Sequence, residues 1–256
     1  MPSLRVTVWN EYLHELENET VASIYPEGIH ATIAAAVAER SGASVRTATL
    51  RQDADHGLAP AVLDDTDVLV WWGHKAHGEV SDEVVTRVHQ AVVGGMGLVV
   101  MHSGHNAKVF HRLMGTNCSL KWREADEKER VWNLAPGHPI MQGVPDHFEL
   151  PQEEMYGERF DVPEPDELLA ISWFQGGEVF RSLCVWQRGH GKVVYFRPGH
   201  ETYPTYHDAN VQTIIANAVT YVAPRLRRST AGCPMTEPLE SVPNWGKEHV
   251  LEQGER

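Results

Sequence analysis

The sequence predicts an α/β fold in which helices cover both faces of a mostly parallel sheet, as in a three-layer architecture. Several short apolar runs, such as 68–72 and 98–101, are hydrophobic throughout instead of alternating, which is typical of strands buried on both faces. These runs alternate with segments of helical periodicity such as 29–41, and this order is typical of parallel strand–helix–strand units. With 42% hydrophobic residues in 256, the chain can bury one large core.

The boundaries of the expected elements follow from local signals. Five strands of the main sheet are expected, in this order: 5–9, 44–50, 68–72, 98–101 and 192–196. Four helices are expected between and after them: 29–41, 81–92, 106–114 and 210–222. Gly42 is suited to end the first helix in the left-handed conformation, and Ser81 is suited to cap the second. The glycine-rich run 94–97 stops that second helix and opens the next strand.

The middle and the end of the chain are less regular. Segment 121–130 is densely charged, and prolines interrupt the segment 132–166 repeatedly. Two further strands, expected to be antiparallel, are 168–173 and 182–186. Beyond Pro224 the composition shifts to proline, arginine, serine and glutamate. We therefore expect an α/β domain over residues 1–223 with an irregular insertion, followed by an extended, proline-containing C-terminal tail over residues 224–256.

The composition argues against several classes of protein. A formal net charge of −13 disfavours binding to nucleic acid or to an anionic membrane, since both need a basic surface. No apolar run approaches the roughly 18 residues of a membrane span, and the early first strand leaves no room for a signal peptide. The three cysteines, Cys118, Cys184 and Cys233, are widely spaced and are expected to be reduced thiols. Together these features predict a cytoplasmic location.

The histidines fall directly after the predicted strands. In an open parallel α/β sheet, ligands bind outside the carboxyl ends of the strands, so residues at these positions converge. Seven titratable residues occupy them: His14, His74, His77, His102, His105, His200 and Glu201. The sequence therefore predicts one site rich in imidazole and carboxylate groups at this edge of the sheet.

This group of side chains is suited to a metal ion. Zinc and manganese prefer imidazole nitrogen and carboxylate oxygen ligands, and a catalytic site keeps one position open. We expect His14, His105 and His200 to be the ligands, because they follow three different strands. The alternative is that these histidines bind a sugar through hydrogen bonds, or that some of them lie in the core or on the surface.

Other residues are candidates for catalysis and substrate binding. Glu154 is expected to act as a general acid or base, since a partly apolar site can raise a carboxyl pKa toward neutrality. Its neighbour Glu153 is more readily explained as a solvated residue. His102, at the end of a central strand, is a further catalytic candidate.

Eight tryptophans, several of them at strand ends or in loops, including Trp122, suit the apolar faces of sugar rings. The residues expected to contact a sugar are Trp72, His74, His77, Arg123, Tyr156 and Arg181. The alternatives are core packing for the aromatic residues and structural ion pairs for the two arginines. The run 94–97 precedes a strand instead of joining a strand to a helix, so no NAD or other nucleotide is expected to bind.

Several motifs resemble the ThuA (trehalose utilisation) family. Four of them occur in one order: 94–103, 138–140, 153–156 and 191–200. Three more, 9–12, 71–77 and 173–181, resemble its ThuA-like bacterial branch. The resemblance runs from about residue 4 to about residue 224. It implies a class I glutamine-amidotransferase-like, flavodoxin-related fold and a role in catabolism of trehalose and related disaccharides. It also implies a sugar dehydrogenase as a pathway partner, and through it a link to 3-keto sugars.

Amidotransferases of this fold carry a cysteine nucleophile on a sharp turn after a central strand, with a histidine–glutamate pair after a later strand. Here the corresponding positions hold Ser103, His200 and Glu201. Since no cysteine lies near either turn, hydrolysis of glutamine by a thiolate is not expected. A serine triad of these three residues remains an alternative. The other reading of Ser103 is a small residue that fits a tight turn.

Two classes of function therefore remain open. The first is an enzyme that acts on a disaccharide or its 3-keto derivative by metal-assisted acid–base chemistry, through isomerisation, elimination or hydrolysis. The second is a non-catalytic sugar-binding or regulatory module. The number of titratable groups favours the enzyme. A homo-oligomer is expected, because the tail contains too few apolar residues to fold alone.

Overall fold

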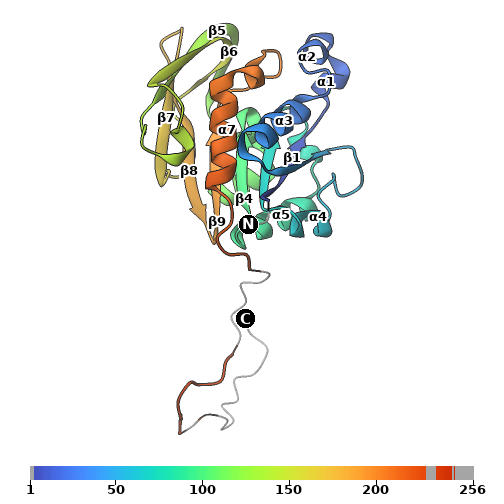
Figure 1. Cartoon of the computed structure of the whole chain (residues 1–256), viewed down its shortest axis with the longest axis vertical. Coiled ribbons are helices and arrows are strands. Elements are labelled where there is room, and N and C mark those ends of the chain that lie inside the picture. The colour runs from blue at the N-terminus through green and yellow to red at the C-terminus, as the bar shows by residue number, and fades with distance from the viewer. Residues whose placement is uncertain (1–2, 229–234, 244, 246–256) are drawn as a thin grey trace.

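The computed structural model describes residues 3–228, 235–243 and 245, and contains one nine-stranded sheet in the order β2-β1-β3-β4-β9-β8-β7-β5-β6 (Figure 1). The strands are β1 (Arg5–Asn10), β2 (Ser44–Thr49), β3 (Val68–Trp72), β4 (Gly97–Met101), β5 (Lys121–Asn133), β6 (His147–Gly157), β7 (Glu167–Phe174), β8 (Val179–Arg188) and β9 (Gly191–Phe196). The α-helices are α1 (His14–Glu17), α2 (Glu19–Ile24), α3 (Ile29–Ser41), α4 (Pro60–Asp64), α5 (Asp82–Val93), α6 (Lys108–Met114) and α7 (Ala209–Tyr221).

One half of the sheet is parallel, as predicted. Strands β2, β1, β3, β4 and β9 all run in the same direction, so that their carboxyl ends share one edge. Every residue of β3 and β4 is buried. Their side chains alternate between two cores, with Val70 and Trp72 on one face and Leu69 and Trp71 on the other. This two-sided burial is the reason that these strands are apolar throughout.

Helices cover both faces of the parallel half, which confirms the α/β class. Helices α3 and α7 pack on one face, where Ile33 and Ile214 join the same core as Val70. Helices α5 and α6 pack on the opposite face, where Val88 and Phe110 join the core that contains Leu69 (Figure 1).

The other half of the sheet corrects the prediction of an irregular insertion. Strands β8, β7, β5 and β6 are antiparallel, and the charged and proline-rich segments form the long strands β5 and β6. In β5 the alternate buried positions include Glu127 and Glu129, so the strand has no apolar alternation to reveal it. Arg130 pairs across the strands with Glu149 at 2.8 Å. Pro151 is tolerated because β6 lies at the edge of the sheet, where an amide has no partner strand.

The predicted caps at Gly42 and Ser81 are confirmed, and three short helices, α1, α2 and α4, were not predicted. Gly42 adopts a left-handed conformation with φ of 69°, and the Ser81 side chain accepts a hydrogen bond from the amide of Val84. Helices α1 and α2 follow β1 directly. The Asn18 side chain caps α2, and α1 begins at His14, which brings this imidazole to the carboxyl edge of the sheet.

The start of the predicted tail packs on the body at the end opposite that edge (Figure 1). The Arg227 guanidinium donates to the backbone carbonyls of Leu63 and Thr66, and the amide of Arg228 donates to Gly94 at 2.8 Å. Much of the predicted tail, namely residues 229–234, 244 and 246–256, lies outside the described residues. In the part of the chain that the structure describes, no helix has the length and apolar character needed to cross a membrane.

Candidate functional site

A cavity of about 450 Å³ lies at the carboxyl edge of the parallel strands, where the sequence predicted a site. One wall comes from the segments that follow β3, β4 and β9, and another comes from β5 and β6. The lining residues are His74, Ser103, His105, Asn106, Ser119, Leu120, Trp122, Glu124, Glu154, Tyr156 and His200.

Three side chains of this cavity and the fully buried His102 next to them converge on one point. One potential ligand atom from each of His74, His102, Glu154 and His200 lies within 4.8 Å of those of the other three. The imidazole rings of the three histidines are 5.5–5.8 Å apart between centroids. The Nε2 atom of His102 lies 3.2 Å from Oε2 of Glu154. The ends of β3, β4 and β9 and the edge strand β6 thus contribute to a single group.

The hydrogen bonds of the three rings determine which nitrogen faces this point. Each Nδ1 atom contacts a protein partner: His74 contacts Nε2 of His14 at 3.1 Å, His102 the carbonyl of Arg197 at 3.1 Å, and His200 the hydroxyl of Thr202 at 2.7 Å. The Nε2 atom of His102 faces Glu154, while those of His74 and His200 lie 3.7 and 3.8 Å from Oε2 of Glu201. For His102 the second nitrogen is engaged by a carbonyl acceptor, as in histidines that bind metals, whereas Nδ1 of His200 also accepts a hydrogen bond from the amide of Thr202 at 3.3 Å.

Burial keeps these imidazoles neutral. Desolvation lowers the pKa of His74 to about 4 and that of His200 to about 3, and it lowers the pKa of His102 well below its ordinary value. The buried Nε2 of His102 and Oε2 of Glu154 have no hydrogen-bond partner among the described residues. At this distance a proton lies between the two atoms, or a cation held by the imidazoles offsets their repulsion, so Glu154 can lie next to an ion without being its ligand. The donor set therefore fits a metal ion.

A second group of side chains, His14 and Glu201, contacts the four-residue group through His74. The Nδ1 atom of His14 lies 3.3 Å from Oε1 of Glu201, and its Nε2 atom contacts His74. Burial, as the largest cause, raises the pKa of Glu201 to about 8. These two residues and His74 form the other set of potential ligand atoms within 4.8 Å of one another. In these contacts His14 orients the ring of His74 and lies outside the four-residue group.

A fully buried ionic cluster, which the sequence analysis missed, lies beneath the cavity. The guanidinium of Arg197 pairs with Glu129 and lies 3.2 Å from Glu153, and it also donates to the carbonyl of Glu154 at 2.5 Å. Glu153 accepts hydrogen bonds from the amide of Gly199 at 3.1 Å and from a threonine hydroxyl. The expectation that Glu153 is solvated is therefore wrong. The cluster connects β5, β6 and the end of β9. Strand β6 also carries Glu154, and His200 follows β9, so the cluster adjoins two residues of the four-residue group.

Four of the residues predicted to bind a sugar do not line this cavity, which corrects the prediction that they contact a ligand there. Trp72 is fully buried, and its indole N–H donates to the carbonyl of Gly199 at 3.1 Å. His77 lies outside the cavity lining, 3.6 Å from the buried carboxylate of Glu11. The two arginines form structural ion pairs, namely Arg123 with Glu127 and Glu178, and Arg181 with Glu158. Of the six predicted sugar contacts, His74 and Tyr156 line the cavity.

The structure also gives the contacts of the predicted serine triad. The hydroxyl of Ser103 donates to the carbonyl of Gly73 at 2.7 Å, and no hydrogen bond joins it to His200 among the described residues. His200 approaches Glu201 through Nε2, at 3.8 Å, while Nδ1 contacts Thr202. The left-handed residue at the turn after β4 is His102, with φ of 48°, and not the serine. The sharp turn thus presents an imidazole.

His105, a predicted ligand, lines the cavity but belongs to neither group of potential ligands among the described residues. Its Nδ1 atom contacts the carbonyl of Cys118 at 2.9 Å, and its ring packs edge-on to Tyr156. Burial lowers its pKa to about 4.

The depressed pKa of His105 predicts an acid-sensitive contribution to stability. The unfolded state takes up the proton near pH 6.5 and the native state only near pH 4, so stability falls as the pH drops between these values. The contribution is about 1.4 kcal/mol per pH unit in this window. We expect a His105→Gln variant to lose less free energy of unfolding than the wild type between pH 6 and pH 5, by about this amount. Urea titrations at the two pH values measure the difference, and equal losses would contradict the assignment.

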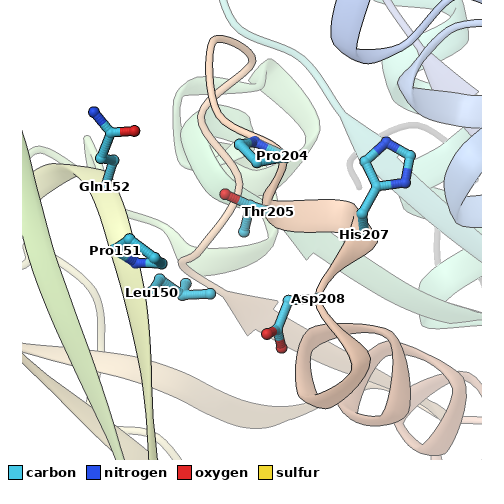
Figure 2. Close-up of a pocket in the computed structure, with 7 residues that line it drawn as sticks. All are labelled: Leu150, Pro151, Gln152, Pro204, Thr205, His207 and Asp208. Atoms are coloured by element: carbon cyan, nitrogen blue, oxygen red, sulfur yellow. The ribbon is translucent and has the colours of Figure 1, made fainter.

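A second cavity, of about 300 Å³, lies on the far side of Glu153. Figure 2 shows its lining residues arriving from β6 on one side and from the segment before α7 on the other: Leu150, Pro151, Gln152, Pro204, Thr205, His207 and Asp208. Asp208 already accepts hydrogen bonds from two amides at the start of α7. This cavity holds neither group of potential metal ligands.

The fold and the site define a class of protein. The chain has an amidotransferase-like α/β fold whose site lies at the carboxyl edge of the sheet, and it lacks a cysteine at the turn after β4. The family model for ThuA, described as trehalose utilisation, matches residues 5–222, and the chain belongs to this family.

Solved structures agree with this fold. A ThuA-like protein from Parabacteroides merdae is similar with a TM-score of 0.64 and 12% identity, over 89% of this chain and 92% of that one. A ThuA-like protein from Bacteroides uniformis has a TM-score of 0.64 and 14% identity, over 87% and 93%. A protein from Salmonella typhimurium described as cytoplasmic has a TM-score of 0.54 and 11% identity, over 86% and 100%. A search of curated proteins gives no match to the chain.

Proposed function

We propose that this chain is a metal-dependent enzyme that acts on a disaccharide, or on its 3-keto derivative, by acid–base chemistry. The observation that carries the proposal is the convergence of His74, His102, His200 and Glu154 at the base of one cavity, where a nitrogen of His102 and an oxygen of Glu154 face each other without a hydrogen-bond partner among the described residues. The trehalose-utilisation context of the family supports a carbohydrate as the substrate.

The three imidazoles are the proposed ligands of a divalent cation, zinc or manganese. Three histidine ligands with an open position are typical of catalytic sites, and the neutral rings have the lone pairs that such an ion requires. When bound, the cation supplies Lewis-acid polarisation of a sugar carbonyl or hydroxyl. His14 and Glu201 hold His74 in the tautomer that directs Nε2 toward the ion.

Glu154 is the proposed base. In a 3-keto sugar the carbonyl acidifies the adjacent C–H bonds, and a carboxylate next to the ligands is placed to remove such a proton. Burial raises the pKa of Tyr156 well above its ordinary value, so its phenol remains protonated and can donate a hydrogen bond to a sugar oxygen. Proton removal at this carbon leads to isomerisation or to elimination of the glycosidic bond. A dehydrogenase that oxidises the disaccharide is the class of enzyme that would supply the substrate.

The role of Glu154 gives a direct test. We expect Glu154→Gln to lower the turnover of 3-keto-trehalose by about 10²–10⁴-fold, because the amide cannot accept the proton. Turnover is followed by NMR with protein supplied with zinc or manganese. The matched control is Glu149→Gln, which changes a glutamate of the same strand outside the cavity lining and is expected to keep most of the activity.

The metal content of the two variants separates the roles of Glu154. Retention of the ion in an inactive Glu154→Gln protein supports the base, whereas loss of the ion would make Glu154 a ligand and contradict the assignment. Wild-type protein that binds trehalose but converts neither it nor its 3-keto derivative would contradict the enzyme and favour a sugar-binding module.

A further inference from the structure

Strands β5 and β6 form a two-stranded wall that extends from the base of the cavity to its rim. In their antiparallel register Trp122 pairs with Tyr156. Residues that pair across antiparallel strands point to the same face, so both aromatic side chains face the same side of the sheet. Both line the cavity. The wall therefore presents two neighbouring aromatic side chains to the cavity: Tyr156 near its base and Trp122 near its rim.

The two aromatic side chains differ in exposure. Tyr156 is 2% exposed and stacks against the ring of His102, with centroids 5.1 Å apart, so it belongs to the base of the cavity. Trp122 is 66% exposed. The tryptophans on β1 and β3 are buried and form parts of the cores: Trp9, Trp71 and Trp72. Trp122 is thus a large aromatic surface left open at the mouth of a polar cavity.

Polar groups surround this exposed indole. Asn106, Ser119 and Glu124 line the same rim and are exposed. Glu124 reaches inward, with one carboxylate oxygen 3.8 Å from Nε2 of His200. An aromatic face beside hydroxyl, amide and carboxylate groups matches a sugar ring, which has apolar C–H faces and a polar perimeter. The carboxylate disfavours anionic ligands such as sugar phosphates.

We infer that Trp122 forms an outer subsite that binds the second ring of a neutral disaccharide, while the first ring occupies the cavity next to His102 and Glu154. The inference rests on the proposed function and adds to it a residue that selects disaccharides over monosaccharides. The cavity of about 450 Å³ is within the range of ligand pockets, and its lining includes both Glu154 and Trp122, so one bound disaccharide can contact both residues.

Binding of trehalose and of glucose to three variants tests the inference by calorimetry. Protein supplied with zinc or manganese is used throughout. We expect Trp122→Ala to bind trehalose about tenfold more weakly than wild type, Trp122→Phe to retain most of the affinity, and glucose binding to change little. The matched control is Trp132→Ala, which removes another exposed tryptophan of β5 that does not line the cavity.

The outcomes distinguish failure of the Trp122 subsite from failure of the proposed function on which it rests. If wild type binds trehalose and Trp122→Ala binds it equally well, the outer subsite is wrong and the proposed function stands. Equal losses for trehalose and glucose would also overturn it, since they place the indole against the first ring. If wild type binds neither of these sugars nor 3-keto-trehalose, the proposed carbohydrate function itself fails. Thermal unfolding of each variant verifies the fold, which Trp122 hardly stabilises because it is exposed.

Discussion

Replacement of Arg197 by methionine is expected to lower the free energy of unfolding by about 3–5 kcal/mol. Arg197 is fully buried, and its guanidinium faces two fully buried carboxylates, those of Glu129 and Glu153. Removing the cation leaves both carboxylates without their counter-charge in a desolvated site. Burial, as the largest cause, already raises the pKa of Glu129 to about 7, so protonation of this group will reduce the loss at low pH. The effect should therefore be larger at pH 8 than at pH 6.

Urea unfolding of wild type and Arg197→Met at these two pH values measures the loss. Arg123→Met is the matched control, because Arg123 also contacts two carboxylates but is partly exposed, and exposed pairs contribute only about 0–1 kcal/mol. A loss for Arg197→Met no larger than that of the control would contradict the account of the buried cluster. A methionine variant that is too unstable to purify agrees with it, and Arg197→Lys then provides a measurable intermediate.

Replacement of His102 by glutamine is expected to weaken binding of zinc or manganese by at least about 100-fold. Changes to residues that only orient a metal ligand cost about 10–100-fold in metal affinity, and His102 is itself a proposed ligand. Its ring is oriented by the carbonyl of Arg197, which contacts the other nitrogen. His200→Gln tests the same site from β9 and should have a similar effect.

Competition with a chromogenic chelator measures these affinities. The matched control is His147→Gln, which removes an exposed histidine of β6 that stacks on Trp132 outside the cavity. Near-wild-type affinity in both His102→Gln and His200→Gln would show that these imidazoles are not ligands. Circular dichroism establishes that each variant is folded, since both residues are buried.

The sequence was sufficient to predict that the histidines of the four-residue group lie at one edge of the sheet. His74, His102 and His200 directly follow or lie close to the carboxyl ends of β3, β4 and β9, and parallel pairing of these strands brings the three together. The contribution of Glu154 was predicted from its motif alone. Its place opposite His102 depends on the antiparallel half of the sheet, which the sequence analysis interpreted as irregular.

Other parts of the site depend on pairings that no local pattern reveals. Glu129, Glu153 and Arg197 are far apart in the sequence, and in isolation each is typical of an exposed residue. His105 follows the same strand end as His102, three residues further along the chain, yet its Nδ1 contacts the carbonyl of Cys118 and its ring lies outside the ligand group. The orientation of such rings is determined by backbone carbonyls that become neighbours only in the folded chain.

Elemental analysis of the wild-type protein, purified without a histidine tag or chelator, tests the central claim most directly. The account predicts about one equivalent of zinc or manganese per chain, lost in His102→Gln and retained in His105→Ala. Loss of the ion from His105→Ala with retention in His102→Gln would contradict the proposed ligand set. Wild-type protein that contains no transition metal, and takes up none when zinc or manganese is supplied, would contradict the metal site itself.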